Sequence, residues 1–325
     1  ASGATTSSSS TTAGTADTSS GSGSSSAASE SGSTGATTDA GTTASTATTS
    51  TSGPTTQGTD TDTGGPVCEP PDVLIVLDRT LTMHKTPGGI TPADPPEYKS
   101  SKWYQAITAI EGLVQPPFDQ SVRFGLELWP RDPGGGQCIT LAERVTNSKM
   151  ATNPACEAGE VVVDVGLGSG QAIIDLLDPA TTTICSTTPT GTALYGAGDY
   201  LDSIKEPGRD QYVVLVTDGA DWDFSCPDPS PLAIVQQLAA AGIKTYVVGF
   251  FGMEADQKAA AFLNDLACAG QTAKGFPTPC QDTPSGWKAK DPNDLTHLYL
   301  QAGNGELTTT LGDVANEIAS MCVPG

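Results

Sequence analysis

The first 66 residues of this 325-residue sequence contain no Lys, no Arg and no aromatic residue. They consist almost entirely of Ser, Thr, Gly and Ala. A segment of this composition buries too little apolar surface to offset the entropy lost when a chain becomes ordered. We therefore expect residues 1–66 to form a disordered, low-complexity tether, and residues 67–325 to form one folded domain with a sizeable core.

Positive charge is also scarce. The whole chain has 15 Lys and Arg against 37 Asp and Glu, a formal net charge of −22. All 15 basic residues and 32 of the 37 acidic residues lie in residues 67–325, so the expected domain is itself acidic. This balance argues against binding nucleic acid or an anionic membrane by charge, and we expect no nucleic-acid partner.

No apolar run reaches the roughly 18 residues of a membrane-spanning helix. The sequence begins at Ala1 without a signal peptide, so we expect a processed form of the protein. The expected location is extracellular or at the cell surface. Membrane attachment would then come only from an N-terminal lipid anchor outside this chain, as in an outer-membrane lipoprotein.

The chain has two His and no C-x-x-C pair, which disfavours a zinc site. Its eight cysteines, an even number beside a Ser/Thr-rich segment, indicate disulfides formed in an oxidising compartment. Eight cysteines allow 105 pairings, and the sequence does not choose among them. As a working hypothesis we pair the two that flank the domain, then near neighbours, then the remainder: Cys68–Cys322, Cys138–Cys156, Cys268–Cys280 and Cys185–Cys226.

Apolar strand patterns and helical patterns alternate along the domain. The six expected strands are Val73–Leu77, Val122–Trp129, Val161–Val165, Tyr212–Val216, Thr245–Gly249 and His297–Leu300. Helical spacing of apolar residues predicts helices near 103–114, 172–177, 190–204, 231–241, 255–268 and 306–321. This alternation predicts an α/β fold, with a doubly wound, mostly parallel six-stranded sheet flanked by helices.

Oxygen-bearing side chains follow two of these strands and begin one helix. Asp78, Thr80 and Thr82 come directly after the first strand, and Asp218 follows the strand at Tyr212–Val216. Thr188 precedes the helical pattern that starts at Thr190. Because open α/β folds bind ligands at the carboxyl ends of parallel strands, we expect these residues to meet there. Carboxylate and hydroxyl oxygens suit a hard divalent cation such as Mg²⁺.

The three segments together resemble the von Willebrand factor type A domain with a metal-ion-dependent adhesion site, as in integrin I domains and many bacterial surface proteins. The family pattern is D-x-S-x-S, then T-x-T-G-x-A-L, then T-D-G. The resemblance covers most of residues 67–325, and Asp78, Thr80, Thr82, Thr188 and Asp218 fall on its metal positions.

This resemblance implies a non-enzymatic binding or adhesion module that holds Mg²⁺, with Mn²⁺ or Ca²⁺ as other ions. Asp218 would act through water, and an Asp or Glu of a protein partner would complete the coordination. The chain departs from the pattern by placing Thr instead of Ser at positions 80 and 82, where the methyl groups crowd a small octahedral site.

Two other functions remain open from the sequence. Asp78-Arg-Thr-Leu-Thr82 also resembles the D-K-T-G-T motif of haloacid-dehalogenase-like proteins, and Asp218-Gly-Ala-Asp221 resembles their acidic metal loop. In that case Asp78 would be the nucleophile of a Mg²⁺-dependent phosphatase. The third alternative is a structural surface or filament component.

Overall fold

The computed structural model describes most of the expected domain. All described residues belong to the unit Asp62–Gly325. The predicted tether, residues 1–66, lies outside them. The described ranges are 69–92, 97–134, 138–140, 157–178, 181–219, 229–250, 257–291, 296–302 and 307–320.

A six-stranded sheet forms the centre of the domain, in the order β10-β7-β6-β1-β2-β4. All neighbouring pairs are parallel except β2 and β4, so the mostly parallel doubly wound sheet predicted from the sequence is confirmed. The strand bounds are β1 Asp72–Asp78, β2 Arg123–Trp129, β4 Glu160–Gly166, β6 Gln211–Thr217, β7 Lys244–Gly249 and β10 Leu300–Gln301.

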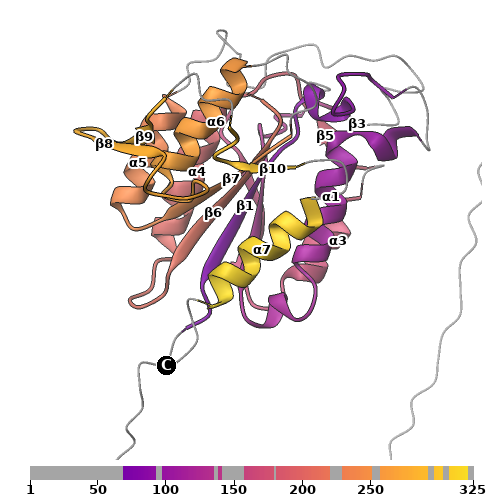
Figure 1. The fold of residues 1–325 in the computed structure, drawn as a ribbon. Helices are drawn as coiled ribbons and strands as arrows, with labels where there is room; N and C mark the ends of the chain where they lie inside the picture. The colour runs from indigo at the N-terminus through magenta and orange to yellow at the C-terminus, as the bar shows by residue number, and fades with distance from the viewer. Residues whose placement is uncertain are drawn as a thin grey trace, which may run out of the picture. The chain divides into compact units, whose positions relative to one another are not determined.

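Helices cover both faces of this sheet (Figure 1). One face carries α1 (Lys102–Leu113), α3 (Gly170–Leu176) and α7 (Leu307–Ser320). The opposite face carries α4 (Thr190–Ser203), α5 (Pro231–Ala240) and α6 (Gln257–Ala269). The three layers bury both sides of the central strands. This explains why β1 and β6 contain continuous apolar runs instead of an alternation of apolar and polar residues.

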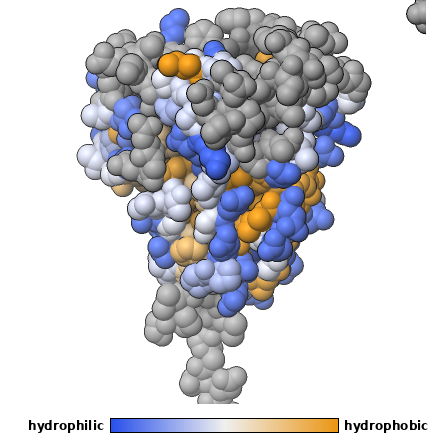
Figure 2. All heavy atoms as spheres, turned by 90° about the vertical axis from the view of Figure 1, so that its right-hand side faces the viewer, coloured by the Kyte–Doolittle hydropathy of each residue, from blue (hydrophilic) through white to orange (hydrophobic). Residues whose placement is uncertain are grey.

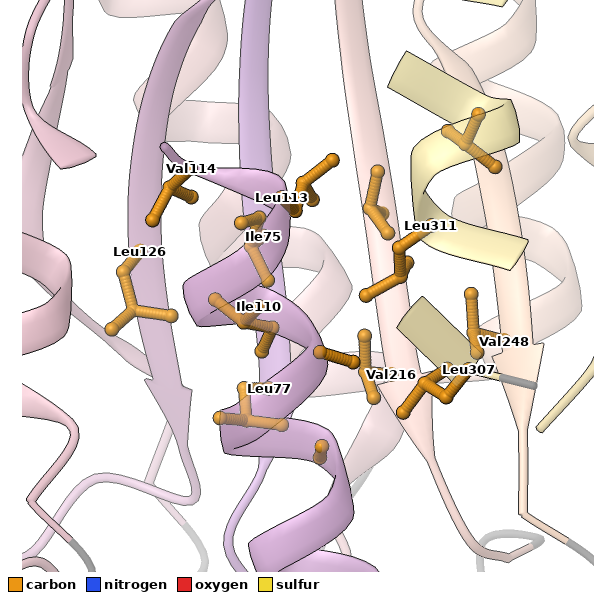
Figure 3. Packing of buried hydrophobic residues seen from close by; sticks show 14 of the residues in the cluster. Ile75, Leu77, Ile110, Leu113, Val114, Leu126, Val216, Val248, Leu307 and Leu311 are labelled. Atoms are coloured by element: carbon orange, nitrogen blue, oxygen red, sulfur yellow. The ribbon is translucent and has the colours of Figure 1, made fainter. Parts of the chain in front are cut away.

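The core under α1 and α7 shows how the sheet is covered (Figure 3). Ile110 and Leu113 of α1 lie over β1, and Leu307 and Leu311 of α7 lie over β6 and β7. These helical residues recur at intervals of three or four and so form one apolar stripe. The stripe fixes α1 against β1, and the start of α1 is one of the segments that form the site described below.

The expected helix boundaries follow from capping residues. Ser101 begins α1, and its hydroxyl accepts a 3.1 Å hydrogen bond from the Tyr104 N–H. Ser230 caps α5, with Pro231 in the first turn. After α5, Gly242 has a φ of 88°, a conformation that glycine adopts at low cost.

Two parts of the secondary structure differ from the prediction. The last strand is β10, Leu300–Gln301, and not His297–Leu300, because Leu300 and Gln301 pair with Val248 and Gly249. Two small antiparallel sheets were not predicted. Their strands are β3 (Ile139–Thr140) with β5 (Thr183–Ile184), and β8 (Cys280–Thr283) with β9 (Gly286–Ala289).

The disulfide hypothesis is confirmed at one pair and wrong at two. Cys268 pairs with Cys280, as predicted. Cys138 pairs with Cys185, which excludes both Cys138–Cys156 and Cys185–Cys226. The reason is the β3–β5 pairing, which brings the residues next to Ile139 and Ile184 together across 47 positions of sequence. Cys68–Cys322 lies outside the described residues.

The surface over α1, α3 and α7 is of mixed character. Figure 2 shows hydrophilic residues around smaller hydrophobic areas on this face. Within the described ranges, no helix is long and apolar enough to cross a bilayer. Large exposed hydrophobic side chains in those ranges are scattered singly, at Ile90, Leu167 and Tyr195.

Candidate functional site

Two carboxylates lie at the carboxyl ends of adjacent parallel strands. Asp78 is the last residue of β1, and Asp218 directly follows Thr217, the last residue of β6. The two strands pair in register from Asp72 with Gln211 to Leu77 with Val216. The sheet therefore brings together two acids that are 140 positions apart in the sequence, as the strand-end argument predicts.

Hydrogen bonds fix the Asp78 carboxylate on both of its oxygens. Oδ1 accepts from the Thr80 N–H at 2.8 Å, and Oδ2 accepts from the Thr217 hydroxyl at 2.6 Å. Asp78 is fully buried. Burial, and then the nearby Asp218 carboxylate, raise the pKa of Asp78 to about 7, while the hydrogen bonds from Thr217 and Thr80 lower it.

The two threonine hydroxyls of the first motif connect the two acids. Thr80 Oγ1 lies 2.9 Å from Thr82 Oγ1, and Thr82 Oγ1 donates a 2.8 Å hydrogen bond to Asp218 Oδ1. The loop reaches this shape because a 3₁₀ helix, η1 (Leu81–His84), begins directly after Thr80. Thr80 is buried while Thr82 is exposed, so the row of oxygens runs from the interior to the surface.

A lysine that was not predicted from the sequence also belongs to the site. The Lys102 ammonium donates to Asp218 Oδ2, and both side chains are almost fully buried. Lys102 is the first residue of α1. No motif in the sequence marks Lys102, because only the packing of α1 against the sheet brings its ammonium to Asp218.

The Thr188 segment lies beside the first motif, but the Thr188 hydroxyl does not join the network described above. Thr80 forms a bridge with Cys185, and the Leu81 N–H donates to the Cys185 carbonyl at 2.8 Å. Thr188 is half-buried just before α4, and its carbonyl accepts from the Thr190 N–H at 2.9 Å. Among the described residues, no hydrogen bond joins the Thr188 hydroxyl to Asp78 or Asp218.

Arg79, between the motif residues, has a different role. Its Nε donates to the Pro130 carbonyl at 2.7 Å, and Nη1 lies 3.4 Å from the Thr183 hydroxyl. Burial lowers the pKa of Arg79, and the negative charges of Asp132 and Glu160 partly oppose this effect. Arg79 therefore connects the end of β1 to the segment after β2 and to β5. Lys102, and not Arg79, is the basic residue that contacts Asp218.

The donor set has the chemistry of a site for a hard cation. It consists of two carboxylates and two hydroxyls, the oxygen ligands that Mg²⁺, Mn²⁺ and Ca²⁺ prefer. Over the described part of the chain, no group of three or more His, Cys, Asp or Glu is placed to hold a metal ion, so a cation at this position would need hydroxyls as further ligands. The oxygen donors fit such an ion, and the Lys102 ammonium occupies one oxygen of Asp218 in this structure.

Comparison with known proteins agrees with this architecture. Residues 158–278 match the model of the von Willebrand factor type A domain. No curated protein sequence matches the chain.

Solved structures with a similar arrangement have low sequence identity. An aerotolerance-related membrane protein from Bacteroides fragilis is 13% identical, with 77% of this chain and 98% of that chain covered and a TM-score of 0.41. The manganese-loaded TRAP protein of Plasmodium vivax is 16% identical, with 75% and 73% covered and a TM-score of 0.43. The pilus adhesin SpaC of Lactobacillus rhamnosus GG is 12% identical, with 78% and 30% covered and a TM-score of 0.47.

Proposed function

We propose that this chain, of which residues 158–278 match the model of the von Willebrand factor type A domain, is a metal-dependent protein-binding or adhesion module without enzymatic activity. The observation that carries the proposal is the row of oxygens from Asp78 through Thr80 and Thr82 to Asp218. The row lies at the carboxyl edge of a doubly wound sheet and reaches the surface at Thr82.

In this proposal Asp78, Thr80, Thr82, Thr188 and Asp218 hold a divalent cation, with Mg²⁺ first and Mn²⁺ or Ca²⁺ as alternatives. When bound, the ion supplies an electrophilic position that takes a carboxylate oxygen from an Asp or Glu of the partner. The chain's own residues keep that position attractive to an anion, because hydroxyls provide several ligands without adding negative charge.

Position 80 favours this function over phosphoryl transfer. Most haloacid-dehalogenase-like phosphatases use a second Asp, two residues after the nucleophile, as acid and base, and this chain has Thr80 there. Asp221, the second acid of the phosphatase alternative, lies outside the described residues.

The proposed setting follows from composition. An acidic domain with disulfides suits an extracellular or cell-surface protein. In this setting residues 1–66 act as the tether that holds the domain of residues 67–325 away from its point of attachment, which for a lipoprotein is a lipid anchor.

Titration of Mn²⁺ and of Mg²⁺ into the protein, followed by calorimetry, tests the proposal. We expect one binding event that Asp78→Asn abolishes without loss of the folded circular dichroism spectrum. A peptide with a single Glu should bind the Mn²⁺-loaded protein better than the matched Gln peptide, and EDTA should remove the difference. Absence of metal binding would contradict the proposal, and hydrolysis of p-nitrophenyl phosphate that Asp78→Asn abolishes would favour the phosphatase.

A further inference from the structure

Lys102 places a positive charge inside the oxygen site itself. Its ammonium donates to Asp218 Oδ2, while Thr82 donates to Asp218 Oδ1, so both oxygens of this acid are occupied. The Lys102 side chain is 10% exposed and that of Asp218 is 2% exposed. A paired charge this deeply buried interacts more strongly than a surface ion pair.

From this geometry we propose that Lys102 is a built-in counter-ion of the site, and that a divalent cation binds only by displacing its ammonium from Asp218. The inference rests on the proposed metal site and adds a residue that regulates it. A metal ion held beside Asp218, directly or through water, and the Lys102 ammonium would repel each other.

The backbone around Lys102 couples this exchange to the loop that carries the hydroxyls. The Lys102 N–H donates to the Lys85 carbonyl at 2.9 Å, and the Lys85 N–H donates to the Thr82 carbonyl at 3.0 Å. The start of α1 and the end of η1 are thus joined directly. The helix start that carries Lys102 and the loop that carries the Thr82 hydroxyl are therefore held to each other by backbone hydrogen bonds.

The alternative is that the Lys102–Asp218 ion pair only stabilises the fold and has no effect on metal binding. In that case its removal would destabilise the domain equally with and without metal. Under the displacement proposal, removal of the charge destabilises the metal-free form and strengthens metal binding. A purely structural ion pair therefore predicts unchanged metal affinity, and the displacement proposal predicts tighter binding.

The experiment measures Mn²⁺ affinity, by electron paramagnetic resonance of the free ion, for the wild type, Lys102→Met and Lys99→Met. Lys99 is exposed, lies three residues earlier and has its ammonium 6.0 Å from the centre of the Tyr104 ring, so it is a matched charge control. We expect Lys102→Met to tighten Mn²⁺ binding by about tenfold or more, the effect of losing a charged hydrogen bond, and Lys99→Met to change it less than about twofold.

Thermal unfolding in EDTA and in excess Mn²⁺ gives a second readout. Lys102→Met should melt at a lower temperature than the wild type in EDTA. Excess Mn²⁺ should raise its melting temperature by more than it raises that of the wild type. Lys102→Gln, which keeps a hydrogen-bond donor without the charge, should behave in the same direction and guards against a folding defect of the Met variant.

The outcomes separate the two proposals. Equal Mn²⁺ affinity in the wild type and both Lys102 variants would overturn the counter-ion role and leave the metal-binding function intact. Failure of every protein, including Lys102→Met, to bind Mn²⁺ would overturn the metal site and the counter-ion role together. Tighter binding in the Lys102 variants alone supports both.

Discussion

The Thr217 hydroxyl donates a 2.6 Å hydrogen bond to Asp78 Oδ2, so the last residue of β6 holds the last residue of β1. Thr217→Val keeps the shape of the side chain and removes this donor from a buried carboxylate. Because hydrogen bonds to charged groups are stronger than neutral ones, we expect a loss of about 1–3 kcal/mol in the free energy of unfolding. Urea denaturation measures it.

Thr245→Val is the matched control for that change. Thr245 is also fully buried in the sheet, on β7, but its hydroxyl has no hydrogen-bond partner among the described residues. Its replacement should therefore leave stability unchanged within about 0.5 kcal/mol or increase it. Equal destabilisation by Thr217→Val and Thr245→Val would show that the Thr217–Asp78 hydrogen bond does not contribute specifically to stability.

The substitution Thr188→Ala tests whether Thr188 is a ligand of the proposed metal ion or only lies near it. As a proposed metal ligand, Thr188 should contribute more to Mn²⁺ affinity than Thr192, which lies within the first turn of α4. We expect Thr188→Ala to weaken Mn²⁺ binding by about tenfold and Thr192→Ala by less than about threefold, in a calorimetric titration. A larger effect of Thr192→Ala would remove Thr188 from the ligand set.

Glu127 makes the stability of the domain depend on pH. Its side chain is buried on β2, and neither carboxyl oxygen has a hydrogen-bond partner in the part of the chain that the structure describes. Gly159 leaves room for it, since a Cβ at Gly159 would lie 1.8 Å from Glu127 Oε1. Burial raises the pKa of Glu127 to about 8 from 4.5.

The sign of the effect follows from proton linkage. Below about pH 4.5, Glu127 is protonated in both the folded and the unfolded protein. Between about pH 4.5 and 8 it is protonated only in the folded protein, so the free energy of unfolding falls as the pH rises. Glu127→Gln should remove this loss and be more stable than the wild type by roughly 2 kcal/mol or more at pH 8. Urea denaturation from pH 4 to 9 tests it, with Glu160→Gln, an exposed carboxylate on β4, as the control. A stability difference between Glu127→Gln and the wild type that does not change with pH would contradict the raised pKa of Glu127.

The two described disulfides should differ in their effect on the site. Removal of Cys138–Cys185, which closes the longer loop, should cost about 4 kcal/mol of stability, and removal of Cys268–Cys280 about 3 kcal/mol. Only the first pair includes a residue that bridges to Thr80. We expect the Cys138→Ala/Cys185→Ala variant alone to weaken Mn²⁺ binding. Identical metal affinity in both double variants would show that the site does not depend on the Cys185 bridge.

Long apolar patterns made much of the fold predictable. β1 and β6 contain uninterrupted apolar runs with Asp78 and Asp218 at or just after their ends, and Ser101 and Ser230 cap α1 and α5. The β8–β9 hairpin was missed because its strands, Cys-Gln-Asp-Thr and Gly-Trp-Lys-Ala, have no clear alternation of apolar and polar residues. Strands of four residues carry too little pattern to recognise.

The site was predictable only in part, because tertiary contacts decide the rest. The motif spacing led to Asp78, Thr80, Thr82 and Asp218, which the sheet brings together. Lys102 lies in no motif, and only the packing of α1 on β1 directs its ammonium to Asp218. Pairing of cysteines by closeness in sequence failed at Cys138 for the same reason, since β3 and β5 meet across a long connection.

The antiparallel strand β4 protects one end of the sheet from other chains. The Val165 N–H donates to the Tyr200 hydroxyl at 2.8 Å, and the Val165 carbonyl lies 3.4 Å from an Arg123 nitrogen. Glu160 and Asp164 are exposed acids on the same edge strand, and the opposite border of the sheet is the two-residue β10. Because charges on an edge strand and very short edge strands discourage pairing with another chain, crowded copies of the domain should resist aggregation by strand addition.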